Sequence, residues 1–529
     1  MNDNLNDVST ADANQIYRIG IDVGGTNTDA ALLDSDLRCV HKVKVHTTAD
    51  VNEGIVEAVR RLLQESGVNG ADIRYAMLGT THCTNAIVER KHLGRVGLIR
   101  IGAPATTAVP PLAGWDESLR AAVGAHSYIA SGGYEYDGRK IANLDEEQIA
   151  ELCRGMSGEV DAVAVCGVFA PVNREQEKRV GDIVREVLGA DMPVTFSSEI
   201  GSIGLLEREN ASVLNAALLQ VIAGVVRGFE EALNGFGINA QLYICQNDGT
   251  LMKSEYALRY PILTIACGPT NSIRGAAHLS GLSDALVVDI GGTTTDIGVL
   301  VQGFPRQSSA AVDIGGIRTN FRMPDILSIG LGGGTVVRLD EEGGVTVGPD
   351  SVGYELTKRA LIFGGDTLTT TDVAVKLGRA AWPGTNADAV DEAVCRKVDA
   401  VMQQSLEDAI DRMKTSADPV DVILVGGGSL LVPDTLAGAS RIIRPDNYDA
   451  ANAIGAALGE VSGESERIYS LDDWSYDDVI RDAKQSAMNE ATAAGANPET
   501  VQIVSVEDIP IAYLPGNALL VKVKAAGKL

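Results

Sequence analysis

The stretch Asp22-Val-Gly-Gly-Thr-Asn-Thr-Asp29 recurs later in the chain as Asp289-Ile-Gly-Gly-Thr-Thr-Thr-Asp296, with six of the eight positions identical. Each copy follows a short apolar run and precedes another, and no helical pattern separates the two runs. This order predicts a strand, a glycine turn and an antiparallel strand in both places. A solenoid repeats about every 20–50 residues, so two copies this far apart instead predict two related half-domains that face each other.

The repeated loop has the composition of a phosphate cradle. Glycine lets the backbone approach a ligand closely, so that N–H groups can point at phosphate oxygens, and threonine hydroxyls add further donors. Asp22 and Asp289 would repel phosphate and are expected to hold Mg²⁺, largely through water, or to orient a nucleophile. The alternative is a pair of tight hairpins in which Asp and Gly only shape the turn. The residues predicted to bind the nucleotide in these loops are Gly24, Gly25, Thr26, Asn27, Thr28, Gly291, Gly292, Thr293 and Thr294.

A third glycine cluster, Gly426-Gly-Gly-Ser429, follows the apolar run Val420–Val425 and precedes a predicted helix. Such a turn lets a flat or anionic group sit at the helix N-terminus, although a simple helix-entry turn has the same pattern. Neither GxxxxGK[ST] nor GxGxxG occurs, which removes support for a P-loop or a Rossmann site. The three loops together resemble the actin-like ATPase/sugar kinase superfamily, in which two such hairpins grip the phosphates across a cleft and a later Gly-Gly loop holds the adenosine. This resemblance implies a duplicated, two-lobed α/β fold of the ribonuclease H-like type, ATP and Mg²⁺ as ligands, and a nucleoside held by Gly426, Gly427, Gly428 and Ser429.

Further motifs resemble the hydantoinase/oxoprolinase A-subunit family, in chain order from Ile19 to about Gly459. The matching stretches are Gly79–Arg90 (GTT…TNA…ER), Leu206–Ala216 (E-x-x-R…VLNA), Asn247–Met252 (NGGLM), Gly268–Ala276 (SGPAGG…GA), Ile329–Gly334 with Val347–Pro349 (GAGGGS…VGP), and Thr371-Asp372. Two stretches depart from the family: Tyr354–Phe363 replaces its PGPACYG segment, and the C-terminal part is shorter than in full-length A subunits. The substrate, and the need for the family's B-type subunit, are therefore left open.

The resemblance implies ATP-dependent hydrolysis of a cyclic amide of the hydantoin, oxoproline or lactam type. Transfer of the γ-phosphoryl group to the amide oxygen would make the resonance-stabilised carbon electrophilic, with the protein supplying position and charge neutralisation. On this reading Thr80, Thr81, Asn85 and Glu89 border the substrate; the alternative is a helix N-cap and a surface ion pair. Two other functions stay open, a small-molecule kinase and a nucleotide-switched regulatory or reactivase subunit.

The other polar residues of note are expected to have structural rather than chemical roles. Cys83 is expected to be a small buried residue and His82 local packing, although the two could form a base and a nucleophile. Glu207, Arg208 and Glu209 are expected to form a charged helix face. No HxxxH, HExxH or GxSxG occurs, so neither a zinc site nor a serine hydrolase is indicated.

The composition of the chain indicates which binding partners and which cellular location to expect. The chain has 529 residues and a net charge of −27, so its surface repels nucleic acid and anionic membranes. No apolar run of 18 residues is present, so no membrane span is expected. The seven cysteines contain no CxxC and suggest reduced thiols in a cytoplasm. A homo- or hetero-oligomer is expected.

The chain is predicted to divide at the repeats. The expected parts are a disordered tail over 1–16, a first lobe over 17–283 with an insertion at about 95–200, a second lobe over 284–461, and a C-terminal extension over 462–529. In the extension we expect a linker over Ser462–Glu466, a helix over Asp473–Ala493 and two strands around the turn Leu514–Asn517.

Overall fold

The computed structural model describes residues 16–24, 27–46, 51–124, 126–201, 203–308, 312–321, 323–512, 514 and 516–529, without the side chains of residues 51 and 52. The expected tail lies almost entirely outside these residues, as do two of the predicted phosphate-loop residues, Gly25 and Thr26.

Each copy of the repeat forms an antiparallel hairpin inside its own sheet. In the first lobe, strand β1 (Tyr17–Val23) pairs with β2 (Asn27–Leu33) on one side and runs parallel to β4 (Ile73–Thr80) on the other. In the second lobe, β11 (Ala285–Ile290) pairs with β12 (Thr295–Val301) and runs parallel to β19 (Val420–Val425). The shared pattern confirms the predicted duplication and places both repeated loops at the carboxyl end of a central, buried strand.

The first lobe has a nine-stranded sheet in the order β22-β23-β21-β10-β9-β4-β1-β2-β3. Its remaining strands are β3 (Cys39–His46), β9 (Gln241–Cys245), β10 (Leu251–Lys253), β21 (Glu460–Ser470), β22 (Gln502–Pro510) and β23 (Ala518–Lys528). Its helices are α1 (Val51–Ser66), α2 (His82–Glu89), α7 (Leu205–Gly235), α8 (Ser254–Arg259), α9 (Cys267–Ser280), α13 (Ala451–Ala456) and α14 (Tyr476–Ala494).

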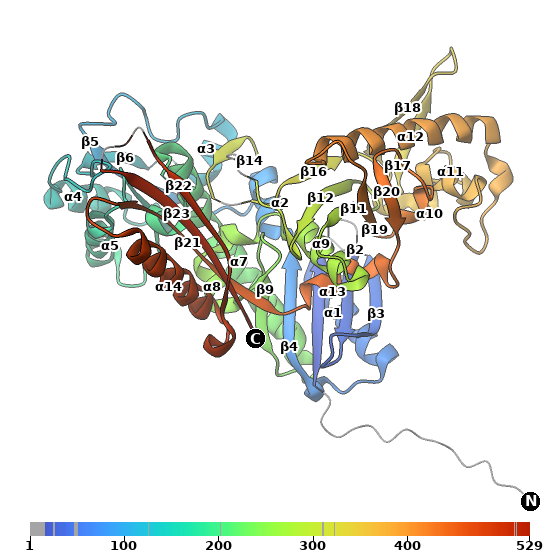
Figure 1. Ribbon diagram of the computed structural model, residues 1–529, viewed down its shortest axis with the longest axis horizontal. Coiled ribbons are helices and arrows are strands. Elements are labelled where there is room, and N and C mark those ends of the chain that lie inside the picture. The colour runs from blue at the N-terminus through green and yellow to red at the C-terminus, as the bar shows by residue number, and fades with distance from the viewer. Residues whose placement is uncertain are drawn as a thin grey trace, which may run out of the picture.

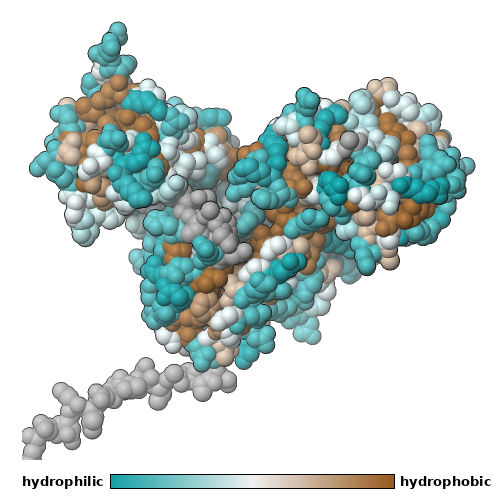
Figure 2. Space-filling model, turned by 180° about the vertical axis from the view of Figure 1, so that it is seen from behind, coloured by the Kyte–Doolittle hydropathy of each residue, from teal (hydrophilic) through white to brown (hydrophobic). Residues whose placement is uncertain are grey.

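The second lobe has a six-stranded sheet, β13-β12-β11-β19-β20 with β16 also paired to β12. The other elements of this half are β13 (Phe304–Pro305), β14 (Val312–Ile314), β15 (Ile317–Thr319), β16 (Ile326–Ile329), β17 (Thr335–Leu339), β18 (Val345–Ser351), β20 (Ala439–Ile443), α10 (Leu356–Arg359), α11 (Thr370–Lys376) and α12 (Glu392–Met413). The space-filling view from behind shows a hollow in the described part of the chain, between this lobe and the rest of the molecule (Figure 2).

The insertion forms a separate four-stranded parallel sheet in the order β6-β5-β7-β8. Its elements are β5 (Val96–Ala103), α3 (Glu117–Val123), β6 (Ser127–Ser131), α4 (Glu146–Met156), β7 (Ala162–Gly167), α5 (Glu175–Leu188), β8 (Val194–Phe196) and α6 (Ser197–Ile200). Figure 1 shows this sheet beside the C-terminal hairpin, on the side of the molecule opposite the second lobe.

The predicted linker over Ser462–Glu466 is wrong, because these residues lie within β21, which joins the first lobe's sheet. Strand β21 packs under α14, whose buried stripe includes Ala483, Ala487 and Ala491. Small residues on both surfaces allow this close packing, and the same small, polar composition looks like a linker in the sequence. The expected helix and strand pair of the extension are α14, β22 and β23.

Helix α7 is 31 residues long and, by length and composition alone, apolar enough to cross a bilayer, although the sequence predicted no such span. In the structure 61% of its most apolar window is buried inside the protein, as in the core helix of a soluble domain.

Candidate nucleotide site

The two repeated hairpins are closed in the same way. Asp22 lies opposite Asp29 in the first register and Asp289 lies opposite Asp296 in the second. The Gly24 N–H donates to the Asn27 carbonyl at 3.0 Å, and the Gly291 N–H donates to the Thr294 carbonyl at 2.9 Å. Each loop therefore presents a carboxylate beside a tight turn.

Helix α9 joins the two carboxylates. The Asn271 side-chain amide donates to Asp22 Oδ1 at 2.9 Å, and the next residue, Ser272, donates its hydroxyl to Asp289 Oδ2 at 2.5 Å. Since adjacent residues of one helix bind carboxylates from two different sheets, the structure brings Asp22 and Asp289 to one place. This is the juxtaposition that the repeat predicted.

The surroundings of both carboxylates raise their pKa values and so favour the protonated form. Burial raises the pKa of Asp289 to about 6; the Ser272 hydrogen bond opposes this shift, and repulsion from Asp296 and Asp22 adds to it. Burial also raises the pKa of Asp22, against the hydrogen bonds from Asn271 and Asn452. A cation between the two carboxylates would relieve this repulsion.

The donor set fits Mg²⁺ that keeps most of its waters. Oxygen ligands from one or two carboxylates, completed by water and substrate phosphate, are the usual environment of this ion. No group of three or more His, Cys, Asp or Glu in the described part of the chain is arranged to hold a metal. That the two aspartates hold the ion through water and the nucleotide stays a prediction.

A glycine on the neighbouring parallel strand makes room for each carboxylate. Asp22 lies beside Gly79, where an added Cβ would be 2.4 Å from Asp22 Oδ1. Gly426 directly follows the partner of Asp289 in β19, and a Cβ there would be 2.2 Å from Asp289 Oδ1. The segments that begin at Gly79 and Gly426 thus hold equivalent positions in the two lobes.

The helix predicted after the third glycine cluster is wrong: a short 3₁₀ turn, Ser429–Leu431, follows instead. The Gly428 N–H donates to the Ile290 carbonyl at 2.8 Å, which ties this loop to the second hairpin. Ser429 is fully buried and its hydroxyl donates to the Gly426 carbonyl. Any nucleoside contact of this segment would therefore come from the glycine backbone.

The threonines of the two loops differ in their surroundings. Thr28 is buried, with its hydroxyl facing Gly54 of α1, whereas Thr293 and Thr294 are exposed at the tip of the second loop. Among the described threonines of the two loops, Thr293 and Thr294 are the pair with exposed side chains that a ligand could reach.

A second glycine-rich segment braces the loop over 291–294. The N–H groups of Gly333 and Gly334 donate to the carbonyls of Gly291 and Gly292 at 3.0 and 2.7 Å. Thr371 in turn donates its hydroxyl to the Gly333 carbonyl at 2.6 Å, and the buried Asp372 completes a capping box with Thr369. The motifs Ile329–Gly334 and Thr371-Asp372 hold the loop in shape.

The structure separates the four predicted substrate residues. Thr80 is buried at the end of β4, and the Thr81 hydroxyl donates to the Val23 carbonyl at 3.3 Å, beside the first loop. Asn85 and Glu89 are exposed further along α2, and Glu89 pairs with Lys91 at 3.3 Å. No bond among the described residues joins either of them to a hairpin, so the surface ion pair is the better account of Glu89.

Sequence reasoning missed the polar residues that hold the carboxylates. These are Asn271, Ser272, Lys44 of β3, which pairs with Asp29, and Asn452 of α13, whose amide donates to Asp22 Oδ2 at 3.1 Å and to Asp29 Oδ2 at 2.9 Å. Asn271 and Ser272 lie inside the Gly268–Ala276 motif, where two polar residues among small ones were a usable signal. Lys44 and Asn452 belong to no motif.

The expected charged face over Glu207–Glu209 is wrong. Arg208 and Glu209 are fully buried, because the first half of α7 is enclosed by the insertion and the first lobe. Glu209 forms a two-point ion pair with Arg100 of β5 at 2.6 and 2.7 Å, and Arg208 donates to the Ser197 hydroxyl at 2.9 Å. These residues anchor the insertion.

His82 and Cys83 take structural roles, as expected. Cys83 is fully buried, and burial raises the pKa of its thiol to about 11, so it stays protonated near neutral pH. His82 bonds to the Thr80 hydroxyl through Nδ1, and burial lowers the pKa of its ring.

Family comparisons agree with the resemblance that the sequence motifs indicated. The family described as hydantoinase/oxoprolinase N-terminal region matches residues 18–188, and the one described as hydantoinase/oxoprolinase matches residues 208–413. The chain belongs to the hydantoinase/oxoprolinase family. It shares 28% identity over 397 residues with the caprolactamase subunit alpha of Pseudomonas jessenii, covering 69% of this chain and 55% of that one.

Two further relatives widen the range of activities in this family. The acetone carboxylase beta subunit of Xanthobacter autotrophicus is 25% identical over 471 residues, covering 82% of this chain and 61% of that one. The acetophenone carboxylase gamma subunit of Aromatoleum aromaticum is 27% identical over 411 residues, covering 70% and 54%. The chain spans just over half the length of the first curated relatives it matches.

Solved structures confirm the fold. The ATP-dependent caprolactamase from Pseudomonas jessenii matches with a TM-score of 0.76 at 21% identity, covering 96% of this chain and 87% of that one. Nucleotide-free acetone carboxylase matches with a TM-score of 0.67 at 17% identity, covering 98% and 88%. The protein therefore has the two-lobed actin-like ATPase fold that the glycine loops implied.

Proposed function

We propose that this protein transfers the γ-phosphoryl group of ATP to the carbonyl oxygen of a cyclic amide of the hydantoin, oxoproline or lactam type and so starts hydrolysis of the ring. The observation that carries the proposal is the meeting of Asp22 and Asp289 on adjacent residues of α9. Membership of a family that includes a caprolactamase subunit supports the cyclic amide as acceptor.

In this proposal the phosphates of ATP bind between the two loops, one from each lobe. Backbone N–H groups around Gly24 and Gly291, with the hydroxyls of Thr293 and Thr294, bind the phosphates. Asp22 and Asp289 would hold Mg²⁺ through water, and the ion would neutralise the phosphate charge. The glycines over 426–428 border the nucleoside, and Thr80 and Thr81 lie on the acceptor side.

The chemistry follows from the acceptor. The bond between the γ-phosphorus and the bridging oxygen breaks, ADP leaves, and a new bond forms to the amide oxygen. The phosphoryl group withdraws electron density from that oxygen, so the carbon becomes more electrophilic and water adds to it to form a tetrahedral carbon. The protonated ring nitrogen then leaves this carbon, which opens the ring as an acyl phosphate, and a second water displaces phosphate from the carbon to give the carboxylate.

Substrate-dependent ADP release tests the proposal. Purified protein, alone and with a B-type subunit, is assayed against hydantoins, lactams and imides, and we expect at least one ring to stimulate ADP release with ring opening. Asp289→Asn should abolish the stimulated rate, whereas Asp284→Asn, an exposed change just before β11, should retain it. Ring-independent ADP release by the complete set of proteins would reject the proposal.

A carboxylase role is the second candidate, because two relatives are named as subunits of acetone and acetophenone carboxylases. The same site would then phosphorylate an oxygen of the carboxylation reactants, and ADP release would require both a ketone and bicarbonate. A stable phosphorylated product would instead indicate a small-molecule kinase. Slow turnover that responds only to a protein partner would indicate a regulatory or reactivase subunit.

The relatives also support a partner subunit. Three of them are named as subunits: caprolactamase alpha, acetone carboxylase beta and acetophenone carboxylase gamma. We propose that this chain likewise acts within a hetero-oligomer.

A further inference from the structure

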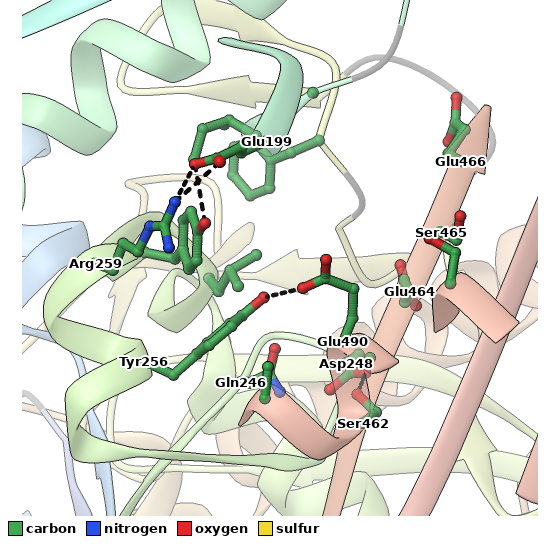
Figure 3. A pocket seen from close by; sticks show the side chains of 18 of the residues that line it. Glu199, Gln246, Asp248, Tyr256, Arg259, Ser462, Glu464, Ser465, Glu466 and Glu490 are labelled. Atoms are coloured by element: carbon green, nitrogen blue, oxygen red, sulfur yellow. Dashed lines mark hydrogen bonds and ion pairs between the residues drawn. The ribbon is translucent and has the colours of Figure 1, made fainter. Parts of the chain in front are cut away.

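A cavity of about 540 Å³ lies apart from the two hairpins, where the C-terminal segment meets the first lobe and the end of the insertion (Figure 3). Its walls come from the loop over 246–248 and α8, from residues 198–201 of the insertion, and from β21 and α14. It therefore exists only when the C-terminal segment is folded onto the rest of the chain. The motif Asn247–Met252, which the nucleotide site leaves unused, supplies part of the wall.

Two carboxylates line this cavity without a cationic partner among the described residues. Glu490 of α14 accepts a hydrogen bond from the Tyr256 hydroxyl at 3.4 Å, and Glu255, the second residue of α8, also lines the cavity. No ion pair among the described residues involves either of them, in contrast to Glu199, which Arg259 binds at 2.8 Å. Figure 3 shows Glu490 and Tyr256 facing each other across the cavity.

The same wall carries an unsatisfied hydroxyl. Ser465 of β21 is only 6% exposed, and its Oγ has no hydrogen-bond partner among the described residues. The rings of Tyr256 and Tyr260, which also line the cavity, lie 4.7 Å apart. Carboxylates, a free hydroxyl oxygen and aromatic faces together form the usual surroundings of an ammonium group.

A residue of the opposite charge, Arg174, also lines the cavity. Arg174 lines this cavity and also a neighbouring one of about 710 Å³, so the two cavities adjoin at this residue. Within the part of the chain that the structure describes, Arg174 forms no ion pair. A guanidinium without a partner suits a carboxylate.

We propose that this cavity binds a zwitterionic ω-amino acid, with its ammonium group at Glu490, Glu255 and Ser465 and its carboxylate toward Arg174. The choice of ligand rests on the proposed function, because hydrolysis of an unsubstituted lactam releases an amine and a carboxylate at the two ends of one chain. The cavity would then be a product site separate from the nucleotide.

Calorimetric titration of the full chain without nucleotide tests this inference. The probe is 6-aminohexanoate, compared with its N-acetyl derivative, which lacks the ammonium group, and with hexylamine, which lacks the carboxylate. Loss of one charge-assisted contact should weaken binding about tenfold. Glu490→Gln keeps an acceptor for the Tyr256 hydroxyl and should cause the same loss for 6-aminohexanoate, whereas Glu499→Gln, exposed and outside the cavity, should not.

Three results would overturn the site: no saturable binding of 6-aminohexanoate at millimolar concentration, equal binding of the N-acetyl derivative, or loss of binding in Asp289→Asn, which would move the ligand to the nucleotide site. Arg174→Gln gives a second readout, because it should weaken 6-aminohexanoate but leave hexylamine unchanged. Binding that persists while no ring stimulates ADP release would reject the proposed function and keep the site.

Discussion

The carboxylate of Asp289 is held at the end of β11 by one hydroxyl, close to two other carboxylates. The ionised form of such a carboxylate is stabilised by a nearby cation and is energetically unfavourable without one. Its counterpart Asp22 receives two amide hydrogen bonds, from Asn271 and Asn452, and is more deeply buried. The two residues of the repeat are thus alike in register but differ in how their charge is accommodated.

The raised pKa of Asp289 predicts a pH-dependent cost to stability. Below pH 4 the group is protonated in both the folded and the unfolded chain. Between pH 4 and about 6 only the folded chain keeps the proton, so the free energy of unfolding falls as pH rises, by roughly 3 kcal/mol for a shift of about two units. Above about pH 6 the group is ionised in both the folded and the unfolded chain, and the full decrease in the free energy of unfolding is present.

Asp289→Asn should remove this cost. We expect the variant to be more stable than the wild type at pH 8 and to lose that advantage toward pH 4, measured as the difference in free energy of unfolding by urea denaturation. Asp284→Asn should show no such pH-dependent gain. A difference between Asp289→Asn and the wild type that does not vary with pH would contradict the assigned pKa.

At the scale of elements, the site depends on the close crossing of α9 and α13. A Cβ at Gly275 would lie 1.9 Å from the Ala451 carbonyl oxygen, and one at Gly455 would lie 1.8 Å from that of Asn271. No side chain fits at either position without moving a helix. Because α9 carries Asn271 and Ser272, its position sets the positions of both carboxylates.

Gly275→Ala should therefore impair both stability and activity. We expect the free energy of unfolding to fall by about 3 kcal/mol and ADP release to fall with it. The matched control is Gly268→Ala on the same helix, where an added Cβ meets nothing within 4 Å; it should be neutral or gain up to about 1 kcal/mol. Equal behaviour of the two variants in urea denaturation would contradict the crossing as the cause.

Regular elements were predicted well where their pattern is local. The apolar run over Val420–Val425 coincides with β19, and the helix expected over Asp473–Ala493 is α14, Tyr476–Ala494. The predictions failed where long-range packing decides the conformation: residues 462–466 become a strand because α14 covers them, and Gly426–Gly428 lead into a 3₁₀ turn because they bond to the second hairpin.

At the scale of the whole molecule, the site joins the two lobes, so a nucleotide should stabilise them together. At about 100 times its dissociation constant, Mg²⁺-ATP should add about 2.7 kcal/mol to the free energy of unfolding. Asp22→Asn and Asp289→Asn should each lose most of this gain, although they lie in different sheets, and Asp284→Asn should keep it. Loss of the gain in only one of the two variants would mean that a single lobe binds the nucleotide.

The sequence by itself determined the duplicated hairpins, their carboxylates and the strands beside them, because turn chemistry and apolar runs act between near neighbours in the chain. Only the tertiary structure decided that Lys44, Asn271 and Asn452 converge on those carboxylates. It also decided that Arg208 and Glu209 are buried anchors. These contacts join residues far apart in sequence, so they depend on how the helices and sheets pack, which no local pattern encodes.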